Sequence, residues 1–136
     1  MSYWLVKTDP DTYNWDDFEK EKKTSWDGIR NYAARNHMKS MKKGDIVLVY
    51  HSGGESEIKG IAKVTKEFYQ DPTTTEVAWC SVELSAGKKL AKVITLSEIK
   101  KNIKLKDMVL IKISRLSVMP VTKEEYDILI SLSEKK

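Results

Sequence analysis

Short apolar runs, separated by polar and turn-forming residues, dominate the hydrophobic pattern of the chain. The run over residues 3–7 predicts an opening strand, which ends at Thr8-Asp9-Pro10-Asp11, where the restriction before proline and the aspartate side chains favour a turn. Residues 46–50 are apolar at consecutive positions, which predicts a strand buried on both faces. Apolar and β-branched runs predict further strands over 58–68, with a bulge at Gly60, over 77–84 and over 109–113.

Cap signals predict two helices in the first third of the chain. Asn14 lies three residues before Asp17, which predicts a helix that ends near Lys22. Residues 31–41 carry apolar side chains partly at helical spacing, and Lys42-Lys43-Gly44 supplies a basic last turn and a stop.

Two capping boxes predict helices in the second half of the chain. Thr95-Leu96-Ser97-Glu98 predicts a short helix that carries Ile99 and Ile103. Thr122-Lys123-Glu124-Glu125 predicts a last helix that runs through Leu132.

This order of elements predicts an α+β fold. The strands are short and do not alternate regularly with helices, which favours a small, mainly antiparallel β-barrel with helices packed on its outside. The chain has 136 residues, of which 40% are hydrophobic and 32% charged, so it can bury one core of ordinary size. We therefore expect a single domain over residues 1–136.

Composition argues against secretion, membrane insertion and metal binding. No apolar run is long enough to span a bilayer, and the first residues lack the features of a signal peptide. Cys80 is the single cysteine, and with only His37 and His51 as imidazoles a closed zinc site cannot be assembled. We expect a monomer without metal or cofactor in a reducing compartment, cytoplasmic or, in a eukaryote, nuclear.

Positive charge is concentrated in one segment. The net charge is +4, but residues 88–115 hold nine Lys/Arg and two Asp/Glu, a surplus of +7, and the rest of the chain has a deficit of −3. Such a surplus is more often a solvated face than a footprint for a polyanion, so alone it favours nucleic acid only weakly.

The residues offer little support for catalysis. His51 and Ser52 are adjacent at a predicted strand end, where successive side chains point to opposite faces, so they do not form a nucleophile and base pair. Cys80 is expected to be a small buried hydrophobe. Gly53-Gly54 lacks the Lys-Ser/Thr and the helix that a phosphate-binding loop requires.

Trp26 is the unusual aromatic residue of the chain. It lies between two predicted helices in a segment that is too polar to be core, whereas Trp79 alternates with buried positions of a predicted strand. Such a ring is about as often a packed plug as a ligand-stacking platform. Donors and acceptors nearby favour the platform, because reading an unstacked base edge requires them beside a flat ring: Ser25, Asp27, Arg30, Asn31 and Arg35.

Four segments of the chain closely resemble the EVE domain family in order and spacing. They are Tyr3-Trp4-Leu5-Val6-Lys7-Thr8-Asp9-Pro10, the stretch from Ser25-Trp26-Asp27-Gly28 to Ala34-Arg35-Asn36, Lys42-Lys43-Gly44-Asp45 running into Tyr50-His51-Ser52, and Ser114-Arg115-Leu116-Ser117-Val118 with Pro120-Val121-Thr122. The resemblance spans essentially the whole chain. It implies a PUA-like fold, related to the YTH and ASCH domains.

The resemblance also implies a function and a pocket. EVE domains are similar to non-catalytic readers that accept a modified base, often a modified cytosine, in DNA or RNA. Carried over by position, the binding residues are Thr8 and Asp9, Trp26 as the stacking ring, Asp27 and Asn31 at the base edge, Tyr50, His51 and Ser52 as a wall, and Arg30, Arg35 and Arg115 toward phosphates or bracing, with Ser117 beside them. Arg115 and Ser117 are as well explained by hydrogen bonds that pin the barrel.

Two other functions stay open. Some ASCH-type relatives look like amidohydrolases that act on modified nucleosides, which requires a base and a nucleophile in the pocket, such as Lys7 with Asp9. A general RNA-binding module without base preference is the third reading, and strong salt dependence is its signature.

Overall fold

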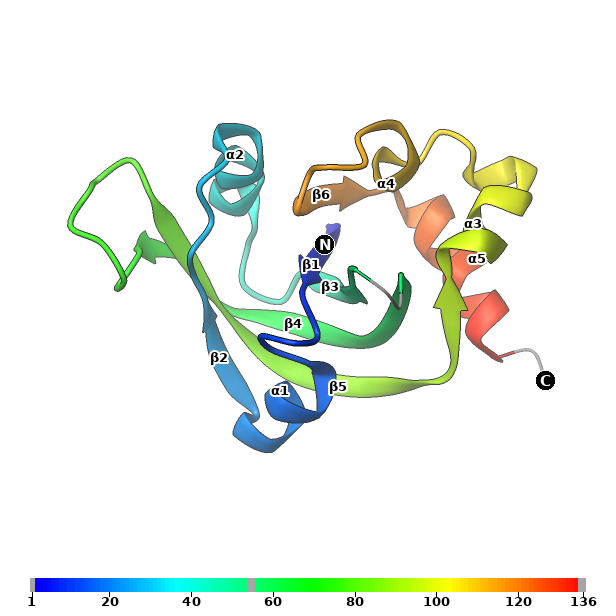
Figure 1. Ribbon diagram of the computed structural model, residues 1–136, viewed down its shortest axis with the longest axis horizontal. Coiled ribbons are helices and arrows are strands. Elements are labelled where there is room, and N and C mark those ends of the chain that lie inside the picture. The colour runs from blue at the N-terminus through cyan, green and yellow to red at the C-terminus, as the bar shows by residue number, and fades with distance from the viewer. Residues whose placement is uncertain (1, 54–55, 135–136) are drawn as a thin grey trace.

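A six-stranded sheet in the order β2-β5-β4-β3-β1-β6 forms the centre of the protein (Figure 1). The computed structural model describes residues 2–53 and 56–134, so Gly54 of the Gly53-Gly54 pair lies outside the described residues. The strands are β1 (Tyr3–Thr8), β2 (Lys23–Trp26), β3 (Ile46–His51), β4 (Glu57–Gln70), β5 (Cys80–Thr95) and β6 (Val118–Val121).

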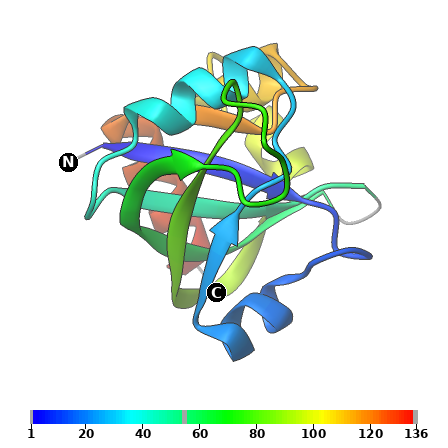
Figure 2. The same ribbon diagram turned by 90° about the vertical axis from the view of Figure 1, so that its left-hand side faces the viewer.

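Neighbouring strands of the described sheet pair antiparallel, except β1 and β3, which run parallel. The α+β class and the mainly antiparallel sheet are confirmed, and the predicted barrel is an open, strongly curved sheet and not a closed one. The strands at the two ends of the order, β2 and β6, have four residues each and pair on one side only. Each spans roughly 13 Å, and the sheet stays open although β4 and β5 curve strongly (Figures 1 and 2).

The helices begin at the caps that the sequence predicts. Asn14 accepts from the backbone of Asp17, and the capping box of Thr95 and Glu98 is complete. In the last box, the backbone N–H of Glu125 donates to the Thr122 hydroxyl. The helices are α1 (Trp15–Glu21), α2 (Tyr32–Ser40), α3 (Leu96–Lys101), the 3₁₀ turn η1 (Ile103–Leu105), α4 (Val109–Lys112) and α5 (Lys123–Glu134).

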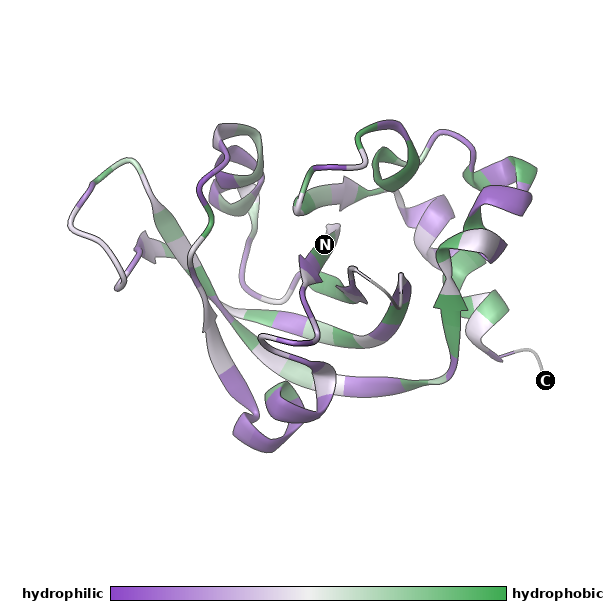
Figure 3. Cartoon of the chain, viewed as in Figure 1, coloured by the Kyte–Doolittle hydropathy of each residue, from purple (hydrophilic) through white to green (hydrophobic). Residues whose placement is uncertain are grey.

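The core lies between the curved sheet and the helices. In β3, residues 47–51 are all buried, as the continuous apolar run predicts. Along β4 and β5, hydrophobic and polar residues alternate, which is visible as alternating colour in Figure 3. The bulge predicted at Gly60 is confirmed by a shift in register between Ile58 and Gly60. A Cβ at Gly60 would lie 2.5 Å from Cη2 of Trp15, so this ring packs directly on the backbone of β4.

The predicted strand over 109–113 is wrong, because these residues form α4 and the following turn. A short apolar run does not by itself distinguish a buried helical turn from a strand. The strand of this region is β6, which pairs with β1 in a continuous register and contains Pro120, a residue that edge strands tolerate. Ile103 is likewise misplaced on the predicted helix, since it begins η1 and is 77% exposed.

Two expectations about aromatic residues are also wrong. Trp26 is not in a loop: it is the last residue of β2, pairs with Val82 and is buried in the hydrophobic core. Trp79 precedes β5, which begins at Cys80 and continues to Thr95 instead of ending at 84. The sequence indicates Cys80 correctly as a small buried residue.

Candidate functional site

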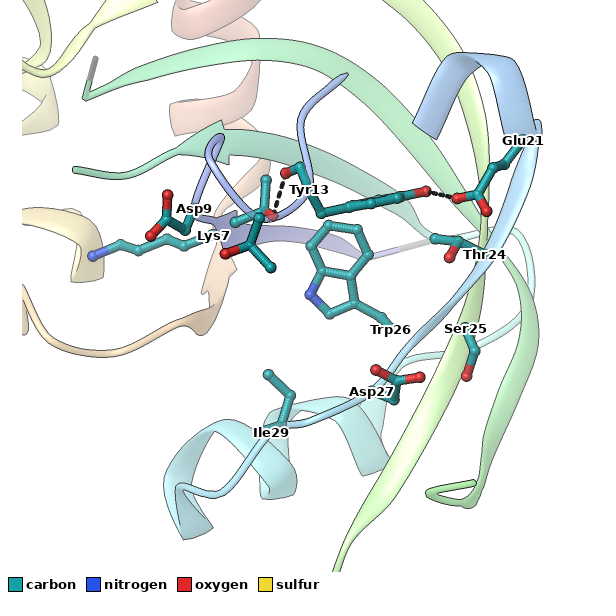
Figure 4. A pocket seen from close by; sticks show the side chains of 11 residues that line it. Lys7, Asp9, Tyr13, Glu21, Thr24, Ser25, Trp26, Asp27 and Ile29 are labelled. Carbon is teal, nitrogen blue, oxygen red and sulfur yellow. Dashed lines mark hydrogen bonds between the residues drawn. The ribbon is translucent and has the colours of Figure 1, made fainter. Parts of the chain in front are cut away.

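A cavity of about 500 Å³ opens between the end of β1, α1 and β2 (Figure 4). Its lining combines two rings, one aliphatic side chain, three carboxylates and one amine. The lining residues are Lys7, Thr8, Asp9, Thr12, Tyr13, Glu21, Thr24, Ser25, Trp26, Asp27 and Ile29.

The first wall is the turn that leaves β1. The Thr8 hydroxyl donates to the Tyr13 carbonyl at 2.6 Å, and the Asp9 carbonyl accepts from the backbone N–H groups of Thr12 and Tyr13 at 3.0 and 2.9 Å. Both ends of this turn are therefore fixed, and the Asp9 and Thr12 side chains face the cavity from a rigid backbone.

The second wall is the Trp26 ring at the end of β2. Its ring packs edge to face on Phe18, at a centroid distance of 6.0 Å, and on Tyr13, at 6.2 Å. Trp26 is only 7% exposed. Figure 4 shows the indole nitrogen on the side of the ring away from Tyr13, with no hydrogen bond to another of the residues drawn. The ring is thus anchored through its carbon edges while its N–H donor faces the cavity.

Tyr13 is held in place from the far side of the cavity. Its hydroxyl donates a short hydrogen bond to Glu21, the last residue of α1. Burial, together with this hydrogen bond to a carboxylate, raises the pKa of Tyr13 to about 12. The phenol is therefore a neutral, fixed group at any ordinary pH.

Asp27 directly follows Trp26 and carries a carboxylate to the rim. Burial and the nearby negative charge of Asp71 raise the pKa of Asp27, and its own backbone N–H and Arg30 oppose the rise. A raised pKa means that this carboxylate gains more than an ordinary aspartate from a hydrogen-bond donor that arrives in the cavity.

Asp71 fixes the segment that follows Trp26. Its side chain is fully buried and accepts from the Gly28 N–H and from Arg30, both at 2.9 Å, and from Thr73. Burial alone would raise the pKa of Asp71, but the hydrogen bonds from Thr73, Arg30 and Gly28 outweigh it and hold the pKa at about 2. Gly28 has a φ of +76°, a conformation that suits glycine.

Three predicted binding residues lie beyond the rim and outside the cavity lining. Asn31 caps α2, because its side chain accepts from the Ala34 N–H at 2.9 Å. Arg30 is bonded to Asp71, and Arg35 donates to the Ala78 carbonyl at 3.2 Å. The structure therefore joins Thr8, Asp9, Trp26 and Asp27 in one cavity, with these three residues on its outer side.

The predicted wall of Tyr50, His51 and Ser52 lies outside the lining of this cavity. Tyr50 and His51 are buried, and His51 Nε2 accepts from the Trp15 N–H at 3.0 Å. The Ser52 N–H donates to the Thr8 carbonyl at 2.9 Å. Ser52 thus holds the end of β1 and His51 holds the start of α1, so both contact elements that line the cavity.

Lys7 links the cavity to the loop before β6. Its amine donates to the Ser114 carbonyl at 2.6 Å, and its backbone N–H donates to the Ser117 carbonyl at 2.9 Å. Burial lowers the pKa of Lys7. Arg115 is exposed on the same loop. The Ser117 contact is a backbone hydrogen bond, the structural role that the sequence leaves open for this residue.

Sequence reasoning missed Thr12, Tyr13, Glu21, Thr24 and Ile29 as lining residues. Tyr13 and Glu21 flank α1 at its two ends, and only the hydrogen bond between them reveals that they face the same space. Ser25, which the sequence predicts near the ring, lines the cavity, and its hydroxyl accepts from the Tyr69 hydroxyl at 2.6 Å.

Within residues 2–53 and 56–134, no cluster of three or more His, Cys, Asp or Glu residues is suited to hold a metal ion. The helices described there are also too short or too polar to cross a bilayer.

The fold and the cavity define an α+β domain in which a short edge strand presents a tryptophan to a polar pocket. The sequence profile of the EVE domain family matches residues 2–132, and the chain belongs to this family. The resemblance noted from the four sequence segments is thereby confirmed.

Human thymocyte nuclear protein 1 is one relative. It is 33% identical over 169 aligned positions, which cover 99% of this chain and 75% of the human protein. A crystal structure of that human protein in complex with DNA containing 5-methylcytosine matches with a TM-score of 0.93 and 33% identity, covering 100% of this chain and 99% of the other.

A more distant likeness exists to the YTH domain of Mmi1. The TM-score is 0.60 at 12% identity, over 96% of this chain and 86% of the other, so the two share a fold. This agrees with the YTH-related architecture that the resemblance implies.

Proposed function

We propose that the protein is a non-catalytic reader that binds nucleic acid and accepts a modified cytosine in the cavity beside Trp26. The observation that carries the proposal is the anchored Trp26 ring with its nitrogen edge toward the cavity, next to the Asp27 carboxylate, in a space of about 500 Å³. The complex of the human relative with DNA containing 5-methylcytosine supports the choice of base.

The chemistry of the lining suits cytosine better than a phosphate. The carboxylates of Asp9, Glu21 and Asp27 outnumber the single amine of Lys7, so the cavity disfavours anions. Cytosine presents an exocyclic amine, which a carboxylate accepts from, and we assign this contact to Asp27. Ile29 offers the apolar contact that a methyl group on the ring requires.

The energetics favour a base that is already unstacked. Stacking of one base on an aromatic face is worth about 1–3 kcal/mol, which is an upper bound for the edge contact that Trp26 offers, whereas extrusion from a duplex costs a few kcal/mol. Single strands should therefore bind more tightly than duplexes, unless cations outside the cavity, such as those of residues 88–115, compensate for the extrusion.

The test is a titration, followed by intrinsic tryptophan fluorescence, with matched single strands that carry cytosine, 5-methylcytosine, 5-hydroxymethylcytosine, adenine or N6-methyladenine. We expect a preference for a modified cytosine that disappears in Trp26→Ala and is reduced in Asp27→Asn. Because Trp26 is buried, Trp26→Phe is the matched variant that keeps an apolar ring, and circular dichroism checks the fold. Equal affinity of the intact protein for all five strands contradicts the proposal.

One observation favours the amidohydrolase alternative. Lys7 lines the cavity with a lowered pKa, which suits a base, although its amine is bonded to the Ser114 carbonyl. If this alternative held, acetylated or methylated nucleosides would be converted to products, and Lys7→Ala would abolish turnover but not binding. We expect chromatography to detect no product.

A further inference from the structure

A face of aromatic and cationic side chains lies on the outer side of the segment that joins β2 to α2. We call it the α2 face, and it consists of Arg30, Tyr32, Arg35, Lys39 and Trp79. The rings of Tyr32 and Trp79 are 4.9 Å apart, and the guanidinium carbons of Arg35 and Arg30 lie 4.8 and 5.6 Å from the centroids of Tyr32 and Trp79 respectively. Figure 2 shows the 71–79 loop beside this segment and the start of α2.

The α2 face is rigid before any ligand arrives. Arg30 is held by Asp71, and the Trp79 indole donates to Glu76 at 2.9 Å. Arg35 donates to the Ala78 carbonyl and to Asn36. Side chains that are already ordered lose little conformational entropy on binding, so contacts to them are efficient.

Parts of the α2 face are open and carry uncompensated positive charge. Tyr32 is 60% exposed as a residue, although its ring also contacts Trp79 and the Arg35 guanidinium. Arg35 uses three of its five N–H donors in hydrogen bonds to protein. Lys39 follows Arg35 at i+4 on the same side of α2, and among the described residues neither side chain forms an ion pair with a carboxylate.

The α2 face is also close to the cavity. Ile29 lines the cavity and Tyr32 begins α2, and three residues of chain span at most about 11 Å. A strand whose base occupies the cavity must therefore pass close to the face if it leaves on this side.

We propose that the α2 face binds the strand on one side of the base in the cavity, with Tyr32 against a neighbouring base and Arg35 and Lys39 on its phosphates. This inference rests on the proposed function for the position of that base. An exposed ring next to fixed cations is the combination that single-stranded nucleic acid requires, because every base has a face to stack and every nucleotide a negative charge. The cavity itself is rich in carboxylates and repels phosphates, so the phosphates are expected to bind on an outer surface such as this one.

The experiment measures the affinity of the protein for single strands of nine nucleotides that carry the 5-methylcytosine at the 5′ end, in the middle or at the 3′ end. Each strand is compared with the same strand without the methyl group. We expect Tyr32→Ala to weaken binding about 5- to 150-fold for the middle position and for one end position, and not for the other. Tyr32→Phe, which keeps the ring, should bind as the intact protein does.

Salt dependence tests the cationic part of the α2 face. The plot of log affinity against log salt has a negative slope. The double variant Arg35→Gln, Lys39→Gln should make this slope less steep by about 1.4, or 0.7 for each phosphate contact in a single strand. Its preference for the modified over the plain strand should be unchanged. Lys123→Gln, an exposed change on α5, is the control that removes one charge elsewhere.

The outcomes separate the two proposals. If the variants of the α2 face bind every strand as Lys123→Gln does, with an unchanged salt slope, the inference about this face is wrong, whatever the base preference. If the intact protein shows no base preference but these variants lose affinity, the proposed reading of a modified base fails and the strand-binding face stands. If the intact protein binds no strand, both are overturned.

Discussion

Asp27 and Asp71 are two neighbouring carboxylates whose pKa values move in opposite directions. Asp71 receives hydrogen bonds from Gly28, Arg30 and Thr73, which outweigh its burial, so its pKa is held at about 2. Asp27 has fewer partners and lies close to the charge of Asp71, so burial and repulsion raise its pKa. The hydrogen-bond acceptors of Asp71 are thus occupied within the protein, whereas the carboxylate of Asp27 is left to interact with a ligand.

Replacing Asp71 should destabilise the protein in a pH-dependent way. A pKa of about 2, against an ordinary value of 3.8, means that ionised Asp71 contributes about 2 kcal/mol to the free energy of unfolding. Because the pKa is lowered by folding, this contribution is present above pH 4 and is lost as the pH falls through about 2. Urea denaturation of Asp71→Asn should therefore show a deficit at neutral pH that narrows below pH 4. A deficit that is the same at all pH values would contradict this account.

Protonation of Asp27 should weaken the binding of a modified cytosine. The contact assigned to it requires a carboxylate that accepts from the exocyclic amine, so affinity should be constant well above its pKa and fall as the pH drops through it. Since the pKa is raised, this fall should begin at a higher pH than for an ordinary aspartate. Asp27→Asn should bind less tightly at neutral pH and lose this part of the pH profile, while titration of the base itself affects both proteins alike. Isothermal titration calorimetry between pH 4 and 8 measures the difference.

At the residue scale, the sequence could predict only those parts of the cavity that are contiguous in the chain. Trp26 and Asp27 stand out as an aromatic ring beside polar groups, and the family resemblance implies Thr8 and Asp9. Tyr13 could not be found in this way, since its role depends on an edge-to-face contact with Trp26 and a hydrogen bond to Glu21 across α1. Such contacts require knowledge of how two elements pack.

At the scale of elements, caps are more informative than apolar runs. The cap at Asn14 and the boxes at Thr95 and Thr122 locate helix starts correctly, because each rests on a specific hydrogen bond between a side chain and the backbone. The run over 109–113 misleads, since a single buried turn of helix and a short strand have the same hydrophobic pattern. The four residues of β2 are too few and too polar to stand out.

The contact between α1 and β4 depends on Gly60. A methyl group there would overlap the Trp15 ring, with its carbon 2.5 Å from the nearest ring atom, and the ring is itself fully buried. We expect Gly60→Ala to lower the free energy of unfolding by about 1–3 kcal/mol, the usual range for overpacking. The matched control is Lys63→Ala, an exposed change on the same strand. Equal midpoints for the two variants in urea denaturation would falsify this reading of the contact.

At the scale of the whole molecule, charge is separated along the long axis. The cavity beside β2 is rich in carboxylates, whereas residues 88–115, with their surplus of +7, include α3, η1 and α4 at the end of the molecule opposite β2 (Figure 1). A ligand that touches both must extend across the molecule, as a strand of nucleic acid can.

This separation predicts that cations far from the cavity affect long ligands only. The variant Lys100→Gln, Lys101→Gln, Lys104→Gln removes three exposed charges from α3 and η1. It should weaken the binding of modified and plain oligonucleotides by the same factor. The negative slope of log affinity against log salt should become less steep by about 0.7 for each phosphate that these lysines neutralise. The binding of a free modified nucleoside should be unchanged. A changed ratio between modified and plain strands would show that these lysines influence the cavity.

The hydrogen bond from Gly28 to Asp71 gives the molecule a natural reporter. A backbone amide exchanges its proton with solvent only when its hydrogen bond opens, and this amide belongs to the segment between Trp26 and α2. The exchange rate of that single proton therefore measures how often the rim of the cavity separates from the 71–79 loop. At constant pH, the effects of an occupied cavity and of substitutions in the loop on this opening can therefore be compared through one exchange rate.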